Sequence, residues 1–173
     1  MEVLSGPVLV LTALLALAGA FKLRRPAPTV GAVRAMHLPS ALVLVRVVGA
    51  LELTLGAATL VTGAQPLLAL TAAAYLAFAA FVAAALLSGS PLQSCGCFGQ
   101  RDTPPSVVHL AANLTAAVVL LIAAAGNLPS PADVLAEQPW HAAPFVLLVL
   151  ISLELTYLLL TALPAVLTPA RPR

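Results

Sequence analysis

The sequence has very little charge. Of its 173 residues only 8% are Asp, Glu, Lys or Arg and 61% are hydrophobic, whereas soluble domains carry about a quarter charged residues. With a mean hydropathy of +1.07, a water-soluble fold of this length could not bury its apolar surface. We therefore expect the lipid bilayer to be the solvent of this chain.

Basic, aromatic and sulfur-containing residues are scarce as well. The net charge is +2, aromatic residues make up 5%, and no run of Lys and Arg is interleaved with aromatics. Such a run is typical of nucleic-acid-binding proteins, so we exclude nucleic acid as a partner. Two cysteines are too few for a disulfide scaffold. A soft-metal transporter would need further thiol or thioether ligands along its path, and the apolar segments have almost none.

Five apolar stretches are long enough to cross about 30 Å of hydrocarbon at 1.5 Å per residue. They are 3–21, 40–62, 67–87, 106–125 and 144–163. These stretches predict an all-α, polytopic membrane bundle of about five transmembrane helices, with a four-helix core and one additional helix, in a single domain covering residues 1–173. A multi-pass protein of the cell membrane follows, and we expect the bacterial plasma membrane.

The borders of these stretches carry local signals. The first stretch stops at Lys22 and is followed by more basic residues, with no basic residues before it, which favours a retained helix over a signal peptide. The linker that follows could form a short interfacial helix over 30–38. Ser106, after two prolines, is a candidate N-cap for the fourth span.

Four polar residues inside the spans are candidate contacts for a substrate or a quinone, because an ionisable or polar group in hydrocarbon is costly. They are Arg46, Glu52, His109 and Asn113. Arg46 could equally extend to the interface, and Glu52 could stay protonated or pair with Arg46. His109 and Asn113 are four residues apart and share one helix face, where they could also hold helices together.

Other residues of the spans have structural interpretations. Gly49 and Gly56 flank Glu52 on one face of the second span, and that face is expected to pack inward because small residues allow close helix approach. In the fifth span, Glu154, a turn before Tyr157, is expected to bond within the bundle.

The most informative segment is the loop between the third and fourth spans, which contains Cys95 and Cys97. Two thiols one residue apart could close a small, strained ring, and a strained disulfide is readily reduced. Three interpretations remain open for this pair: redox exchange, linear coordination of copper(I) or mercury(II) by two thiolates, or two incidental loop cysteines. No metal site is predicted beyond that possibility.

These residues resemble a known family. The segment Ser94–Gly99, with its Cys-Gly-Cys-Phe-Gly core, is similar to the signature of the MauE family of small membrane proteins, which are related to the DoxX group. The small residues before Lys22, then Glu52 with Gly56, and Asn113 resemble further family features in the same order. The likeness covers roughly Val8–Ala125 and leaves the fifth span out.

The resemblance implies thiol-disulfide chemistry. The MauE family is associated with methylamine utilisation and with a thioredoxin-like partner in forming disulfides, so Cys95 and Cys97 are expected to be the reactive residues of an oxidoreductase. The layout also resembles vitamin K epoxide reductases and DsbB proteins, which implies a quinone as electron acceptor. Those families use a second cysteine pair, which is missing here, so a partner must exchange directly with Cys95 or Cys97. A soft-metal carrier and a non-catalytic accessory protein remain the alternatives.

Two arguments about the side of the membrane disagree. The basic linker around Arg24 and Arg34 and the cysteine loop both follow odd-numbered spans, so they share one side. The positive-inside rule assigns that side to the cytoplasm. Disulfide formation belongs outside, where thiols are not kept reduced, and the chemistry implied by the resemblance leads us to expect the outer face.

Overall fold

The computed structural model describes residues 4–88, 104–126, 133–134 and 139–163, apart from the side chains of 139–142. Five of its helices are long and apolar enough to cross a membrane, which confirms the predicted bundle. They are α1 (Ser5–Arg24), α3 (Leu42–Thr62), α4 (Gln65–Leu87), α5 (Val107–Ala125) and α7 (Pro139–Thr161). The short helix α2 (Ala27–Ala35) follows α1.

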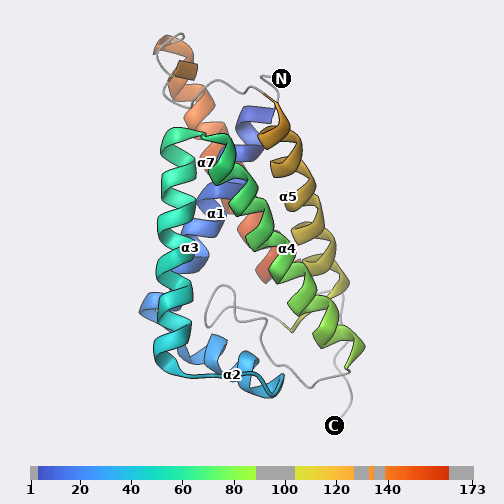
Figure 1. The fold of residues 1–173 in the computed structure, drawn as a ribbon. Helices are drawn as coiled ribbons and strands as arrows, with labels where there is room; N and C mark the ends of the chain where they lie inside the picture. The colour runs from blue at the N-terminus through green and yellow to red at the C-terminus, as the bar shows by residue number, and fades with distance from the viewer. Residues whose placement is uncertain (1–3, 89–103, 127–132, 135–138, 164–173) are drawn as a thin grey trace.

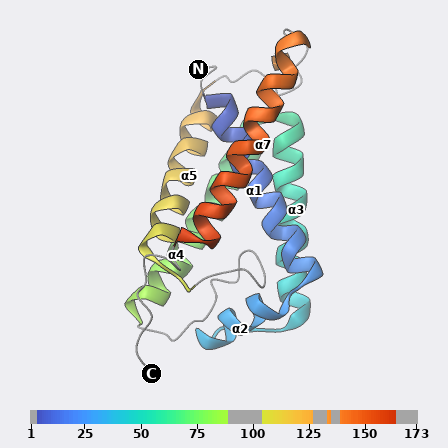
Figure 2. The same ribbon diagram turned by 180° about the vertical axis from the view of Figure 1, so that it is seen from behind.

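The long helices are roughly parallel rods, and α2 lies across one end of them (Figure 1). Helix α1 packs mainly against α3, and α4 mainly against α5, while α7 covers α1 on the other side. Seen from behind, α7 crosses in front of α1, on the outside of the other long helices (Figure 2). The four-helix core therefore consists of α1, α3, α4 and α5, and α7 is the additional helix.

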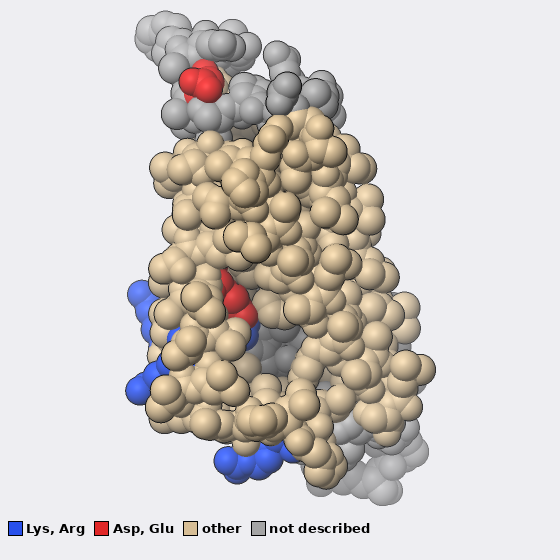
Figure 3. All heavy atoms as spheres, viewed as in Figure 1, with Lys and Arg blue, Asp and Glu red and all other residues tan. Residues whose placement is uncertain are grey.

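Several helix termini lie together at the end of the bundle that α2 crosses. Helices α1 and α4 end there, and α3 and α5 begin there (Figure 1). Ala32 of α2 packs with Ala85 and Phe81 near the end of α4. Arg24, Arg25 and Arg34 are exposed at this end, where Lys and Arg side chains gather on the surface (Figure 3).

A tight turn joins α3 to α4. Gly63 ends α3 with φ 61°, a left-handed conformation that suits glycine, and its N–H donates to the carbonyl oxygen of Thr59 at 2.9 Å. The hydroxyls of Thr59 and Thr71 lie 3.0 Å apart and hydrogen-bond across the two helices. The short turn makes α3 and α4 antiparallel neighbours, as their spacing in the sequence predicts.

Helices α1 and α3 approach each other unusually closely. A β-carbon built on Gly56 would lie 2.6 Å from the backbone nitrogen of Ala16 and 2.7 Å from the carbonyl oxygen of Thr12. A β-carbon on Gly19 would meet the backbone nitrogen of Leu53. Glycine is therefore required on both helices, which confirms that the glycine face of α3 packs inward.

Several helix borders differ from the predicted ones. Helix α1 continues to Arg24, because the basic residues add a further turn instead of ending the helix. Helix α2 covers 27–35, shifted toward the N-terminus because Pro28 suits a first helical turn. Helix α7 begins at Pro139, so Pro144 lies inside it.

Candidate functional site

A buried ion pair joins α1 to α3. The ammonium of Lys22 lies 2.7 Å from Oε2 of Glu52, and the two side chains are only 5% and 6% exposed. Glu52 occupies the middle of α3, and Lys22 lies in the last turn of α1. Two opposite charges removed from water together are far less costly than either one alone. The pair thus explains how a carboxylate can be held in the middle of an apolar helix.

The close approach of the two helices positions this pair. A β-carbon on Gly49 would lie 2.9 Å from Cβ of Lys22, so the lysine side chain passes directly over the glycine. Gly19 precedes Lys22 by three residues, and Gly49 precedes Glu52 by three. Each charged residue thus follows, by about one helical turn, a glycine at which the other helix approaches closely.

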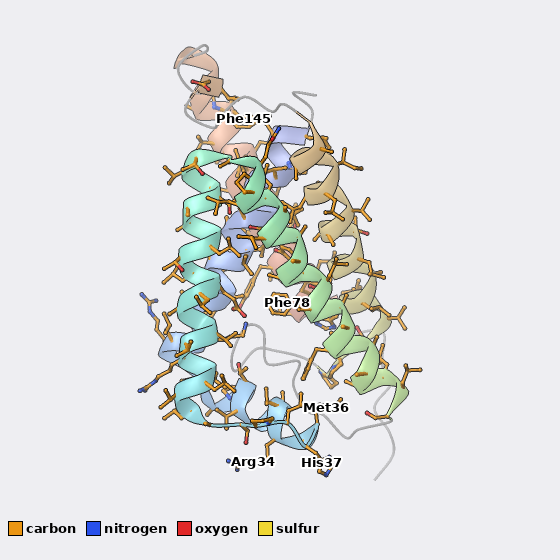
Figure 4. All side chains as sticks on the ribbon, in the orientation of Figure 1. Arg34, Met36, His37, Phe78 and Phe145 are labelled. Carbon is orange, nitrogen blue, oxygen red and sulfur yellow. The ribbon has the colours of Figure 1, made fainter. Side chains whose placement is uncertain are left out.

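An aromatic side chain forms another part of this site. The Lys22 ammonium lies 5.2 Å from the ring centroid of Phe78, within the range of a cation–π contact. Phe78 projects from α4 toward the interior of the bundle (Figure 4), and Tyr75 packs edge-on against it at 6.1 Å. Contacts of Lys22 therefore join three helices of the core.

The second oxygen of the carboxylate is available to a further group. Oε1 of Glu52 is buried and has no hydrogen-bond partner among the residues that the structure describes. An unsatisfied buried acceptor costs about 1–3 kcal/mol. The site can therefore accept a hydrogen bond from a donor that enters it.

His109 and Asn113 lie together near the start of α5. His109 is 2% exposed, and its Nδ1 lies 2.9 Å from the hydroxyl of Ser106. The Asn113 amide donates to the carbonyl oxygen of His109 at 2.7 Å. Ser106 occupies the N-cap position, but its hydroxyl contacts this imidazole and makes no capping hydrogen bond.

A small cavity connects this pair to the aromatic residues. It has a volume of about 60 Å³ and is lined by His109 and Asn113 as well as Tyr75 and Phe78. Phe78 thus contacts the ion pair on one side and borders the cavity on the other. Phe78 therefore lies between the ion pair and a mainly apolar cavity, in which His109 and Asn113 are among the few polar lining residues.

A large apolar groove adjoins the cavity. It has a volume of about 700 Å³ and runs between α1, α5 and α7. Leu11, Ala112, Ala116 and Thr156 line both the groove and the small cavity. Because the lining is almost entirely apolar, the groove suits the hydrocarbon part of a ligand, and the cavity offers polar groups at its inner wall.

Comparison with known proteins places this arrangement in a family. The sequence model of the family described as methylamine utilisation protein MauE matches residues 2–129. The chain belongs to the MauE family. No curated protein and no solved structure matches it.

The MauE match includes all the residues of the ion pair and the cavity on α1, α3, α4 and α5. Helix α7, which forms one wall of the groove, lies beyond it. The identification agrees with the resemblance deduced from the cysteine motif, and it establishes a multi-pass membrane protein of the MauE family.

Two other residues singled out in this MauE-family sequence, Arg46 and Glu154, do not belong to the ion pair or the cavity. Arg46 is exposed on α3, and the partner of Glu52 is Lys22, because the glycine contact turns the carboxylate toward α1. Glu154 is exposed on α7 instead of bonding within the bundle, while Tyr157 stacks on Phe21.

Cys95 and Cys97 lie outside the described residues. The flanking helices are described: α4 ends at Leu87 and α5 begins at Val107, both at the end of the bundle that α2 crosses. The two helices that flank the cysteine motif in the sequence thus end and begin at the same end of the bundle.

Two residues of the site were missed in the sequence. Lys22 was interpreted as the border of a span, and Phe78 was not singled out among the residues of the third span. The repeated pattern of a glycine three residues before a charge, at Gly19 with Lys22 and at Gly49 with Glu52, is the signal that could have identified the pair. Phe78 had no comparable signal, because its role depends on how α4 is rotated.

Proposed function

We propose that this protein is a membrane thiol-disulfide oxidoreductase whose reactive groups are Cys95 and Cys97. The observation that carries the proposal is the Cys-Gly-Cys motif in the sequence of a chain that belongs to the MauE family. The family description names methylamine utilisation; for this chain we propose the thiol chemistry, in the bacterial plasma membrane.

The exchange requires a partner protein with two thiols, for which we propose a thioredoxin-like protein. A thiolate of the partner attacks one sulfur of the Cys95–Cys97 disulfide, forming a mixed disulfide and releasing the other cysteine as a thiolate. The second thiolate of the partner then attacks its own sulfur in the mixed disulfide. The partner leaves oxidised, and Cys95 and Cys97 retain two electrons and, as thiols, two protons.

We propose a quinone as the acceptor of the electrons. The apolar groove offers space for a quinone and its isoprenoid tail, and His109 and Asn113 border the small cavity that adjoins it. A quinone bound there would supply an acceptor for two electrons and two protons from the reduced cysteines.

Replacing one cysteine should trap the partner. Either Cys95→Ser or Cys97→Ser leaves a single thiol that can form the mixed disulfide but cannot resolve it. We expect a reductant-sensitive adduct on non-reducing gels of tagged protein from its native host, with at least one of the single variants. Cys95→Ser/Cys97→Ser is the control and should give none. If neither single variant forms an adduct, protein exchange is wrong, and the metal or accessory interpretations take its place.

Thiol labelling in intact cells should give both the side and the redox state of the pair. We propose the outer face, so a membrane-impermeant maleimide should label the cysteines after reduction and not before. Addition of a quinone to reduced membranes should then restore protection, which alkylation and mass spectrometry measure. Labelling by the permeant reagent alone would assign the pair to the cytoplasm, as the exposed arginines favour, and electrons would then flow outward from the cytoplasm.

A further inference from the structure

Exposed arginines lie where α1 ends and α3 begins. Arg24 is the last residue of α1 and Arg25 follows it, while Arg46 lies in the second turn of α3. All three side chains are exposed. Lys and Arg side chains lie together on this flank of the bundle, beside the first turns of α3 (Figure 3). Two helices therefore bring basic residues from separate parts of the sequence to one flank.

The contact between α1 and α3 gives the relative depth of these residues in the membrane. The two helices run in opposite directions, and the side chain of Lys22 passes over Gly49. Arg24 follows Lys22 by two residues along α1, and Arg46 precedes Gly49 by three residues along α3. Because each residue of a helix advances by about 1.5 Å, Arg24 and Arg46 lie at nearly the same depth, closer to the end of the bundle than the ion pair.

This depth corresponds to the border of the hydrocarbon. Arg24 ends one spanning helix, Ser5–Arg24, and Arg46 lies close to the start of another, Leu42–Thr62. Large apolar side chains surround Arg46 on the surface of α3: Val43, one turn before it, is 71% exposed, and Val47, directly after it, is 49% exposed. An arginine in such a position keeps its aliphatic part against hydrocarbon and extends its guanidinium to the interface. The flank therefore combines positive charge with a surface that acyl chains can cover.

A counter-charge for Arg24 and Arg46 is expected from outside the chain. Neither arginine makes a hydrogen bond or ion pair with a residue in the described ranges. Of the six Asp and Glu residues, Glu52 is bound within the ion pair and Glu154 lies in the spanning part of α7. Asp102 directly follows Arg101 in the sequence, so their formal charges cancel. The other three precede α1 or lie between α5 and α7, next in sequence to helix termini at the opposite end of the bundle.

We propose that Arg24 and Arg46 bind the phosphate of an anionic phospholipid whose acyl chains lie along α3. A guanidinium can donate two parallel hydrogen bonds to phosphate oxygens, and Arg25 adds a third positive charge beside them. A phospholipid supplies a phosphate at the depth of the arginines and acyl chains for the exposed valines. A soluble anion or a protein outside the membrane would supply the charge without the acyl chains. The lipid can belong to either leaflet, so this proposal does not depend on the thiol chemistry or on the side of the cysteines.

Native mass spectrometry of the full chain, released from detergent micelles with added lipid, tests this surface. Phosphatidylglycerol should bind about tenfold more tightly than phosphatidylcholine with the same acyl chains, because each arginine near an anionic lipid surface contributes about fivefold in affinity. This comparison uses the unaltered protein, so it does not depend on the folding of a variant. Glycerol 3-phosphate, which has the phosphate but no acyl chains, should not displace the lipid.

Two single variants test the place of the lipid. Arg46→Gln should weaken the binding of phosphatidylglycerol about fivefold. Arg34→Gln is the matched control and should stay within about twofold, because it also removes an exposed positive charge at this end of the bundle, but from α2 (Figure 4). There the Nε of Arg34 lies 3.4 Å from the hydroxyl of Ser40. Equal affinity for the two lipids, equal losses in the two variants, or displacement of the lipid by glycerol 3-phosphate would each overturn the proposal.

Discussion

Replacing Lys22 with methionine is expected to cost about 3–5 kcal/mol of stability, because it leaves the Glu52 carboxylate buried without a counter-charge. Both oxygens of Glu52 would then lack a partner among the described residues, since Oε1 has none already. The double variant Lys22→Met/Glu52→Leu should recover most of the loss, because it removes both charges and keeps similar volumes. Thermal unfolding in detergent micelles measures all three proteins.

The two single variants should differ from each other. Glu52→Leu should cost less than Lys22→Met, because the freed lysine stands in the last turn of α1 and can extend toward the interface. Arg46→Met is the matched control: it also removes a positive charge, but from an exposed position on α3, and should change stability little. If the losses of the two single variants simply add in the double variant, the ion pair is not the source of the effect.

Adding a single methyl group at Gly56 is expected to destabilise the protein by about 1–3 kcal/mol. The new β-carbon would lie 2.6 Å from the backbone nitrogen of Ala16, and backbone cannot move aside as a flexible side chain can. Helices α1 and α3 would have to separate, which also lengthens the contact between Lys22 and Glu52. Unfolding of Gly56→Ala in micelles should therefore begin at a clearly lower temperature.

The control for this prediction is a second glycine-to-alanine substitution, which should stabilise the protein instead of destabilising it. Nothing lies within 4 Å of a β-carbon built on Gly31 in α2, so Gly31→Ala adds helix propensity without a clash and should stabilise by about 0.5–1 kcal/mol. A stabilised Gly56→Ala variant would show that the two helices are further apart than described. A destabilised Gly31→Ala would show that α2 packs against something at that position.

The sequence was sufficient to predict where the spanning helices lie along the chain. It was not sufficient to predict which residues of other helices they contact. Apolar length alone identifies α3 and α4, because a stretch that must cross the hydrocarbon leaves few alternatives. The inward face of α3 was also predictable, since Gly49 and Gly56 mark it from within the helix itself. The pairing of Glu52 was not, because it depends on which helix meets that face, and no periodicity within α3 contains that information.

The same limit explains why the surroundings of two charged residues, Lys22 and Glu154, were predicted wrongly. Lys22 follows an apolar run, where a lysine normally marks the interface, and only the approach of α3 buries it. Glu154 lies in a span where a carboxyl is expected to face inward, yet the rotation of α7 is set by Phe21 and the groove. Both cases depend on contacts between helices that are distant in the sequence.

The division of charge between α1 and α3 has a consequence for biogenesis. No Asp, Glu, Lys or Arg occurs in α4 or α5, so each can leave the translocon for lipid alone. For α3, a charge near the middle of the helix adds about 2.5–3.5 kcal/mol to insertion, and Glu52 is such a charge. Helix α1 is synthesised first and presents Lys22 on the face that α3 meets. We infer that α1 stays beside the translocon until α3 arrives, so that the two helices enter the bilayer with Lys22 and Glu52 already paired.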